Sequence, residues 1–444
     1  MIKRSKAFPA LILGFIFVLI FLFFAKDLLP SNISKLGFII PVILIDIYLW
    51  SSIRPETKDQ KNFLRLLIFV MFWFPFALFV GSYIISAIVP FKEWNSAFRT
   101  YYFAILIVAY ISKLIPAILL IFSDFIRSIV FMVSKLSPKT DETIPTRLMP
   151  RSRFLKYVGL MGGGLVFSGL LAGMIKWVYD FKVQHIPVTL KDLPNAFKGF
   201  RIVQISDLHL GSWASSEPLE DAVQIINDLD PDIVVFTGDL VNYSTEEAFQ
   251  FKDTLQKIKA TNGVFAVLGN HDYGDYIRWN KPTDKARNML DLYRFYKSLG
   301  WNLLNNSNVL IERDSQKIAL IGVENWGSIM RFPRKGDIAK AKTGTEEVKV
   351  KILLSHDPTH WDKIISQTEK DINLTLSGHT HGAQFGFEKG NFRWSPAQYI
   401  YKQWAGLYQS ADKEQFLYVN RGIGHIGYPG RIGILPEITL IELI

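Results

Sequence analysis

Cysteine is absent from this chain of 444 residues, and histidine is absent from its first 184. The lack of cysteine excludes disulfides, thiolate metal sites and cysteine nucleophiles. All eight histidines lie at or after His185. Because histidine is the commonest metal ligand and a frequent acid–base group, chemistry of that kind belongs to the C-terminal part of the chain.

The first 182 residues also have few acidic side chains. They hold 21 Lys and Arg against 9 Asp and Glu, a net charge of +12, whereas the rest of the chain holds 29 against 31, a net charge of −2. The basic balance therefore belongs to the N-terminal region, which is also the more apolar one. A nucleic-acid-binding domain needs a basic face, so we expect no nucleic-acid partner.

Long apolar runs fill that region. Five of them approach the roughly 20 residues with which a helix crosses a bilayer: Phe8–Phe24, Leu36–Ile53, Phe63–Val89, Tyr101–Phe122 and Leu155–Ile175. We expect residues 1–182 to form a membrane region with about five transmembrane helices and residues 183–444 to form a separate domain. A signal peptide is the alternative for the first run, but Ala25-Lys26-Asp27 is a poor cleavage site and favours an uncleaved anchor.

Basic residues in short loops predict the orientation. The loops on the N-terminal side of the membrane hold 13 and the other two hold 4, which places the N-terminus inside and, with five spans, the C-terminal domain outside. The fourth span contains Lys113 and Pro116; if it does not cross, the domain is cytoplasmic. Arg151 and Arg153 resemble a twin-arginine export signal with one residue inserted, and a plain basic anchor is the alternative.

Two charged residues and two glycine pairs stand out within the apolar runs. Intramembrane charges are costly, so Asp46 and Lys113 either have a function such as transport, lie near a span end or pair with each other. The pairs Gly159/Gly163 and Gly169/Gly173 have the small-xxx-small spacing of helix–helix contacts, within the chain or in a dimer.

Five short motifs in the second half follow apolar runs that predict strands. The runs are Ile202–Ile205, Ile233–Phe236, Val264–Leu268, Val348–Leu354 and Ile372–Leu376. The motifs are Asp207-Leu208-His209, Gly238-Asp239, Gly269-Asn270-His271-Asp272, Ser355-His356-Asp357 and Gly378-His379-Thr380-His381. Oxygen and nitrogen ligands without sulfur suit two divalent metal ions, for which Mn, Fe, Zn and Co are all compatible. Two neighbouring metals are the usual device for cleaving phosphate esters.

The five motifs, in this order, resemble the calcineurin-like metallophosphoesterase superfamily over roughly Gly199 to Ile444. Membrane-associated bacterial phosphoesterases are the most similar type, through the stretches Ser206–Gly211 and Arg421–Gly424. The resemblance implies an α/β fold in which a multi-span helical region precedes a four-layer α/β/β/α sandwich. It implies a hydrolase acting on phosphate ester bonds in a bacterial-type cell membrane. Helical spacing at Leu219–Leu229, Glu246–Lys259 and Asp284–Ser298 agrees with such a sandwich.

The resemblance also implies roles for single residues. The first metal would take Asp207, His209, Asp239 and His381. The second would take Asp239, Asn270, His356 and His379, so that Asp239 bridges. His271 would protonate the leaving oxygen while a water activated between the metals attacks. Because His379 and His381 would serve different metals, a turn is expected there, with Gly378 and Gly382 loosening the backbone.

Several neighbouring residues have two interpretations. Asp272 and Asp357 either orient a histidine or serve as turn residues, while His360 and His425 are expected to be structural. Asn242 stands where the family often has an aspartate that orients the general acid, which puts a dyad with His271 in doubt.

The sequence is compatible with more than one class of substrate. The aromatic segment Phe385–Tyr408 suits either a membrane-side lip or a core. Trp326, Met330 and Phe332, with Arg331, Arg334 and Lys335, are candidates for an opposite wall. We expect membrane lipids and a phosphate-ester substrate as partners, with a lipid or another amphiphile as the substrate. The alternatives are soluble nucleotide or cell-wall phosphates, or a non-catalytic membrane sensor. The sequence does not give the oligomeric state.

Overall fold

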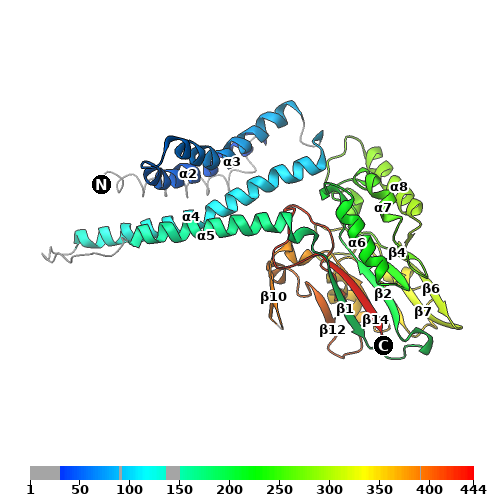
Figure 1. Cartoon of the computed structure of the whole chain (residues 1–444). Coiled ribbons are helices and arrows are strands. Elements are labelled where there is room, and N and C mark those ends of the chain that lie inside the picture. The colour runs from blue at the N-terminus through cyan, green and yellow to red at the C-terminus, as the bar shows by residue number, and fades with distance from the viewer. Residues whose placement is uncertain (1–30, 90–92, 137–150, 391) are drawn as a thin grey trace. The chain divides into compact units, whose positions relative to one another are not determined.

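The computed structural model describes residues 31–89, 93–136, 151–390 and 392–444, which divide into two compact units (Figure 1). The first unit holds the helical N-terminal region up to Gly169, except for Ser96–Tyr101. The second unit holds those six residues together with Leu170–Ile444. The expected span at Phe8–Phe24 lies outside the described residues.

Long apolar helices make up the N-terminal region. They are α2 (Ser31–Ile53), α3 (Asn62–Ile88), α4 (Ser96–Leu136) and α5 (Arg151–Ile175). Within the described residues, three helical stretches are long and apolar enough to cross a membrane: Asn62–Ile88, Phe98–Val133 and Phe154–Tyr179. Helix α2 coincides with the second expected span. Helix α4 runs 14 residues past the expected end at Phe122, and its end precedes Pro138, which cannot continue a helix.

The two charges in the apolar runs pair with each other. Lys113 Nζ lies 2.6 Å from Asp46 Oδ1, and the Tyr110 hydroxyl donates to the other carboxylate oxygen at 2.9 Å. Lys113 also donates to the carbonyl oxygen of Phe72 at 2.8 Å. Buried charges persist where they are paired and hydrogen-bonded. The structure therefore supports the pairing alternative.

The two glycine pairs of α5 differ. A Cβ on Gly159 would lie 2.9 Å from the Cα of Pro116, and one on Gly163 would lie 2.7 Å from the carbonyl oxygen of Ser112. These glycines therefore let α4 and α5 approach closely, as expected. Among the described residues the second pair does not mark a contact between helices: Gly169 faces open space, and Gly173 faces the backbone of Arg431.

Two six-stranded sheets form the second unit (Figure 1). The first has the order β1-β14-β2-β3-β4-β5, with strands Lys182–Val188, Glu437–Leu443, Phe200–Ile205, Ile233–Phe236, Val264–Ala266 and Asn302–Leu303. The second has the order β12-β13-β9-β8-β7-β6, with strands Gly406–Gln409, Phe416–Val419, Leu374–Ser377, Lys351–Leu354, Gln316–Gly322 and Ser307–Arg313. Strands β2 to β5 are parallel, as are β7, β8, β9 and β13. All five expected strands are present, some with shorter bounds.

Successive side chains of each strand point to opposite faces of its sheet, and this alternation produces the four layers. In β2, Ile202 points into an apolar cluster shared by both sheets, whereas Val203 points to the outer face. That outer face is covered by α6 (Glu217–Asp228) and α8 (Pro282–Leu299). Trp361 and Ile365 cover the outer face of the second sheet. The expected α/β/β/α arrangement is therefore confirmed.

One expected helix is different. Residues 246–259 form a 3₁₀ stretch, Thr245–Phe251, followed by the single turn α7 (Lys252–Leu255). Thr245 is held by two hydrogen bonds to Asn288, and the Glu247 carboxylate turns back to accept the backbone N–H of Asn242 at 2.7 Å. Such tertiary bonds override helix propensity and favour the tighter turn.

Candidate metal centre

The five motifs meet where the two sheets adjoin. They follow β2, β3, β4, β8 and β9, and open α/β sheets place their sites at such strand ends. The backbone N–H of Asp207 donates to Gly238 at 2.9 Å, and that of His379 donates to the Asp207 carboxylate at 3.0 Å. The loops of one sheet are therefore tied directly to those of the other.

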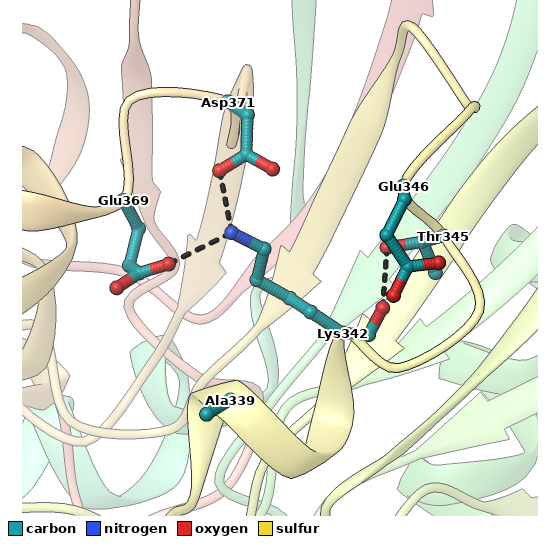
Figure 2. Close-up of a pocket in the computed structure, with 6 residues that line it drawn as sticks. All are labelled: Ala339, Lys342, Thr345, Glu346, Glu369 and Asp371. Atoms are coloured by element: carbon teal, nitrogen blue, oxygen red, sulfur yellow. Dashed lines mark hydrogen bonds and ion pairs between the residues drawn. The ribbon is translucent and has the colours of Figure 1, made fainter.

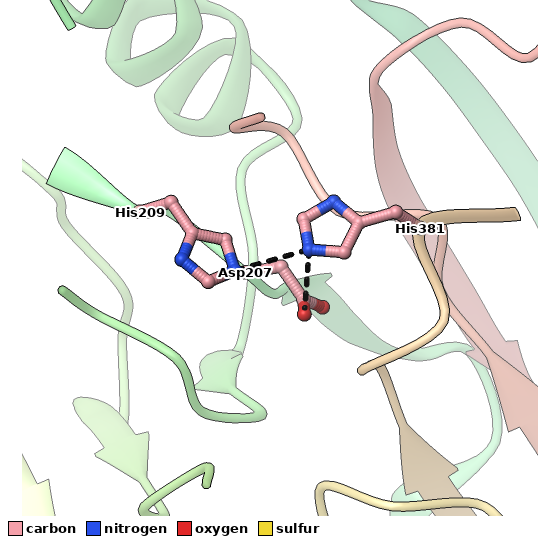
Figure 3. A group of neighbouring side chains, drawn as sticks. All are labelled: Asp207, His209 and His381. Carbon is pink, nitrogen blue, oxygen red and sulfur yellow. Dashed lines mark hydrogen bonds and ion pairs between the residues drawn. The ribbon is translucent and has the colours of Figure 1, made fainter. Parts of the chain in front are cut away.

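The first group of side chains comprises Asp207, His209 and His381 (Figure 3). All three are buried. His209 Nε2 lies 3.1 Å from His381 Nε2, which in turn lies 3.2 Å from Asp207 Oδ1. Two nitrogens that each lie about 2.1 Å from one ion are about 3.0 Å apart when they meet at right angles. The spacing therefore fits a shared cation.

The second group comprises Asp239, His356 and His379. His379 Nδ1 lies 3.1 Å from His356 Nε2, and His356 Nε2 lies 3.2 Å from Asp239 Oδ2. The remaining nitrogen of His356 faces the Thr237 carbonyl oxygen at 2.7 Å. That carbonyl accepts a hydrogen bond from Nδ1–H, which leaves Nε2 as the nitrogen free to bind a metal.

Asp239 lies between the groups. Its Oδ2 is 3.6 Å from His209 Nε2 in the first group and 3.2 Å from His356 Nε2 in the second. Its Oδ1 accepts the backbone N–H of His271 at 2.8 Å instead. A single carboxylate oxygen, rather than both, therefore faces both groups.

The side-chain carbonyl oxygen of Asn270 is free to bind a metal. Its Nδ2 donates to the Tyr276 hydroxyl at 2.7 Å, while its buried Oδ1 has no hydrogen-bond partner. Buried polar atoms are rarely left unpaired, and a role in binding an ion is one of the few explanations. The free carbonyl oxygen fits the ligand role that the resemblance implies.

Most of the expected ligands have a strained backbone. Left-handed φ values occur at five of the seven: Asp207 (53°), His209 (46°), Asp239 (61°), His379 (74°) and His381 (50°). Each such residue costs about 1–3 kcal/mol and persists only where its surroundings enforce it. The concentration of strain at these positions points to a functional constraint.

The turn expected after β9 is present, but its two glycines have different roles. Gly382 has a φ of 54°, which glycine adopts at no steric cost. Gly378 is required for space, because a Cβ there would overlap Ser206 Oγ and Asp207 Oδ2. The turn directs His379 toward one group and His381 toward the other.

Burial and neighbouring charges set the protonation of these groups. Burial alone would raise the pKa of Asp207, but His381 and His356 outweigh it and hold that pKa well below its usual range. Burial lowers the pKa of His209, and His271 acts in the same direction. Burial opposes a charge on His356 as well, yet Asp239 raises its pKa to about 10. Because a histidine ligates through an unprotonated nitrogen, a cation and this proton compete for His356.

His271 is half-buried beside both groups. Its ring packs edge-on against His209 at 4.9 Å and stacks on Tyr276 at 4.2 Å between centroids. Its Nδ1 lies 2.8 Å from the backbone carbonyl oxygen of Asn242. The orientation that a carboxylate often provides in the family is thus supplied here by a carbonyl of the residue that replaces it.

The two aspartates with two interpretations separate clearly. The Asp272 carboxylate anchors backbone, because it accepts N–H groups of Asp239 at 3.0 Å and Gly269 at 2.8 Å. Asp357 is a turn residue, because its Oδ1 accepts from Thr359, whereas its Oδ2 lies 3.5 Å from His379 Nε2 and makes no hydrogen bond among the described residues.

His360 and His425 are buried outside the groups, as expected for structural residues. His360 bonds to Ser355 at 2.9 Å and stacks on Trp326, and His425 Nε2 faces the Ser212 carbonyl oxygen at 3.2 Å.

Two tyrosines contact expected ligands of the centre, although neither lies in one of the five motifs. The Tyr401 hydroxyl lies 2.8 Å from His379 Nε2, and Tyr276 holds Asn270. Tyr276 lies in the same loop as Asn270, six residues further along the chain, and Tyr401 lies in a loop without an expected ligand. Tyr401 lies within the aromatic segment that the sequence singled out, but its position there gave no sign of a histidine partner.

The wall expected opposite the aromatic segment is mostly occupied by internal contacts. Phe332 is buried and packs edge-on against His379 at 4.8 Å between centroids. Arg334 donates to the carbonyls of Gly327 and Ser328. Arg331 is exposed, with its guanidinium over the Phe332 ring at 4.8 Å.

A surface hollow occurs apart from the metal groups (Figure 2). Its lysine, Lys342, is neutralised by Glu369 at 2.8 Å and Asp371 at 2.6 Å. None of the residues that line it belongs to the five motifs. The hollow therefore adds nothing to the centre.

Comparisons with known proteins agree with this geometry. A family described as "Calcineurin-like phosphoesterase" matches residues 200–383, and one described as "Probable Calcineurin-like phosphoesterase, transmembrane domain" matches residues 31–177. The chain is 31% identical to a "Transmembrane protein with metallophosphoesterase domain" of Danio rerio over 67% of each protein. It is 30% identical to the "Uncharacterized metallophosphoesterase YkuE" of Bacillus subtilis, over 66% of this chain and 98% of that one.

A solved 5'-nucleotidase precursor of Thermus thermophilus is 12% identical over 55% of this chain and 54% of that one, with a TM-score of 0.33 that is too low to inform the fold. The sequence relatives and the two matched families together cover both the apolar helices and the motif-bearing domain. The chain therefore belongs to the calcineurin-like metallophosphoesterases and is a membrane protein with a phosphoesterase domain.

Proposed function

We propose that this protein hydrolyses phosphate esters at a dinuclear metal centre. The observation that carries the proposal is the position of Asp239 Oδ2 between two histidine groups, 3.6 Å from His209 and 3.2 Å from His356. Asp207 and His381 would complete the first metal site, and Asn270 and His379 the second. When bound, two divalent ions would polarise the phosphoryl oxygens and lower the pKa of a bound water.

The chain's own residues would position the substrate and move a proton. His271, held through Nδ1 by the Asn242 carbonyl, leaves Nε2 as the nitrogen that can deliver a proton to the leaving oxygen. Tyr401 and Thr237 fix the rings of His379 and His356 through their outer nitrogens. Such outer hydrogen bonds orient metal ligands and raise their basicity.

A phosphate ester of a lipid or another amphiphile is the substrate class that we favour. The membrane helices keep the domain near lipid, and Tyr401 is directly preceded by the exposed Tyr399 (76%) and Ile400 (67%). Apolar residues next to a residue of the centre suit an acyl chain. Soluble nucleotide or cell-wall phosphates remain the alternative. A non-catalytic sensor is disfavoured because all seven expected ligands are present in the chain.

The test is hydrolysis by the full chain in detergent. After loading with Mn²⁺ or Zn²⁺, it should cleave a chromogenic aryl phosphodiester and should lose this activity in a chelator. Phospholipids and lipid phosphates offered in mixed micelles should turn over with a higher kcat/KM than nucleotides. The same turnover in metal-free protein would contradict the metal role, and a preference for nucleotides would contradict the lipid substrate.

We also propose that the N-terminus lies inside and the phosphoesterase domain outside a bacterial-type cell membrane. The support is the excess of basic residues in alternate loops, which resist translocation. The cysteine-free chain allows a direct test. We expect an impermeant thiol reagent on intact cells to label Glu312→Cys, at a side chain 60% exposed in the domain, and to spare Gln60→Cys, in the exposed loop between α2 and α3. The reverse labelling would place the domain in the cytoplasm.

A further inference from the structure

The hairpin of β10 (Phe387–Lys389) and β11 (Phe392–Trp394) has one aromatic and one polar face, and five of its six strand residues are exposed. The strand register pairs Phe387 with Trp394 and Lys389 with Phe392, so these four share one face. Phe387 is 51% exposed and Phe392 is 62% exposed. Their rings contact each other at 6.1 Å between centroids. An aromatic face is therefore turned outward.

The polar face of the hairpin is exposed as well, but its two side chains bond to the rest of the domain. Its cross-strand pair is Glu388 and Arg393. Glu388 accepts a hydrogen bond from Arg421 at 2.6 Å, and Arg393 donates to the Ala405 carbonyl oxygen at 2.7 Å. A two-stranded hairpin is marginal by itself, so these contacts hold it against the domain through its polar side chains and leave the aromatic face without such anchors. The outward aromatic face is thus built into the fold.

The base of the hairpin is linked to a membrane helix within the second unit. The backbone N–H of Gly386 donates to Ile432 at 2.9 Å, and that of the preceding residue, Arg431, donates to Gly173 at 3.2 Å. Gly173 lies near the end of the candidate span Phe154–Tyr179. The Tyr428 hydroxyl also donates to the carbonyl oxygen of Leu170 in that span. Three residues of one loop thus join the hairpin base to the end of a span.

We propose that the β10–β11 hairpin inserts its aromatic face into the membrane interface and docks the phosphoesterase domain on the bilayer. Aromatic rings are favoured at the headgroup level, and the exposed Lys389 on the same face suits anionic headgroups. A hairpin tied to the end of a span is held at the depth where such rings are stable. This proposal concerns a surface and does not depend on the hydrolysis proposed above.

The test uses the full chain with a single cysteine on the aromatic face, Phe387→Cys or Phe392→Cys, labelled with an environment-sensitive nitrobenzoxadiazole dye. The matched control is Leu290→Cys, an apolar side chain 54% exposed on α8. Each labelled protein is placed, one chain per particle, in lipid nanodiscs of phosphatidylcholine and phosphatidylglycerol, with or without brominated acyl chains. Size-exclusion chromatography checks that every variant is folded and monodisperse.

We expect both hairpin labels to emit at shorter wavelength than the control and to lose most of their emission in brominated lipid. The Leu290 label should keep the longer emission wavelength of a dye in water and should not be quenched by brominated lipid. Hairpin labels that match the control would overturn the proposal. Emission that shifts only with two chains per particle, without bromine quenching, would also overturn it, because a second copy of the chain would then cover the face.

Discussion

Replacing Asp239 by asparagine is expected to lower turnover by roughly 10³-fold or more and to reduce the metal content of both groups. The amide is nearly the same size as the carboxylate, and its oxygen can still accept the His271 N–H that Oδ1 accepts at 2.8 Å. Its NH₂ would then take the place of Oδ2 and point a donor at both cations. Metal stabilisation of the transition state is worth several kcal/mol, and about 1.4 kcal/mol corresponds to a tenfold change in rate.

Elemental analysis and steady-state kinetics of the purified variant measure the two effects. Asp228→Asn is the matched control, because it removes a carboxylate at the end of α6 that is outside both groups. This control should keep its metals and its activity. If Asp239→Asn held two metals as tightly as the unaltered protein, the bridging position of this residue would be refuted.

Replacing His271 by alanine should have the next largest effect, about 10²–10⁴-fold in kcat for an ester with a poor leaving group. The loss should be much smaller for a nitrophenyl ester, whose leaving group needs no proton. The metal content should stay unchanged, because the side chain contacts the Asn242 carbonyl, Tyr276 and the outer edge of His209 rather than completing either group.

Kinetics with the two classes of ester, on protein with measured metal content, decide between proton transfer and other roles. His185→Ala removes an exposed histidine of β1 and serves as the control, with no effect expected on either ester. Equal losses of His271→Ala on both esters would assign it to phosphate binding or to structure instead of acid catalysis.

Local sequence patterns were enough to predict most of the helices and strands and the composition of the candidate site. Apolar runs identify helices such as α3 and strands such as β3 because the length and spacing of apolar residues are local properties. Asp207, Asp239 and His356 were expected at one site because their motifs resemble those of the calcineurin-like metallophosphoesterases, and their places after predicted strands agree with that expectation. Their geometry matches this expectation, and their binding of metal remains the prediction that the substitutions above test.

Which atoms and faces meet became visible in the folded domain alone. Residues 246–259 became a 3₁₀ stretch and one turn because Asn288 and Glu247 hold the chain there. The Asn242 carbonyl faces His271, and Tyr401 faces His379, across 29 and 22 residues. The aromatic face of the β10–β11 hairpin points outward because Arg421 and the Ala405 carbonyl hold its polar face. Contacts between residues far apart in the chain depend on the packing of the whole domain, and no local periodicity encodes them.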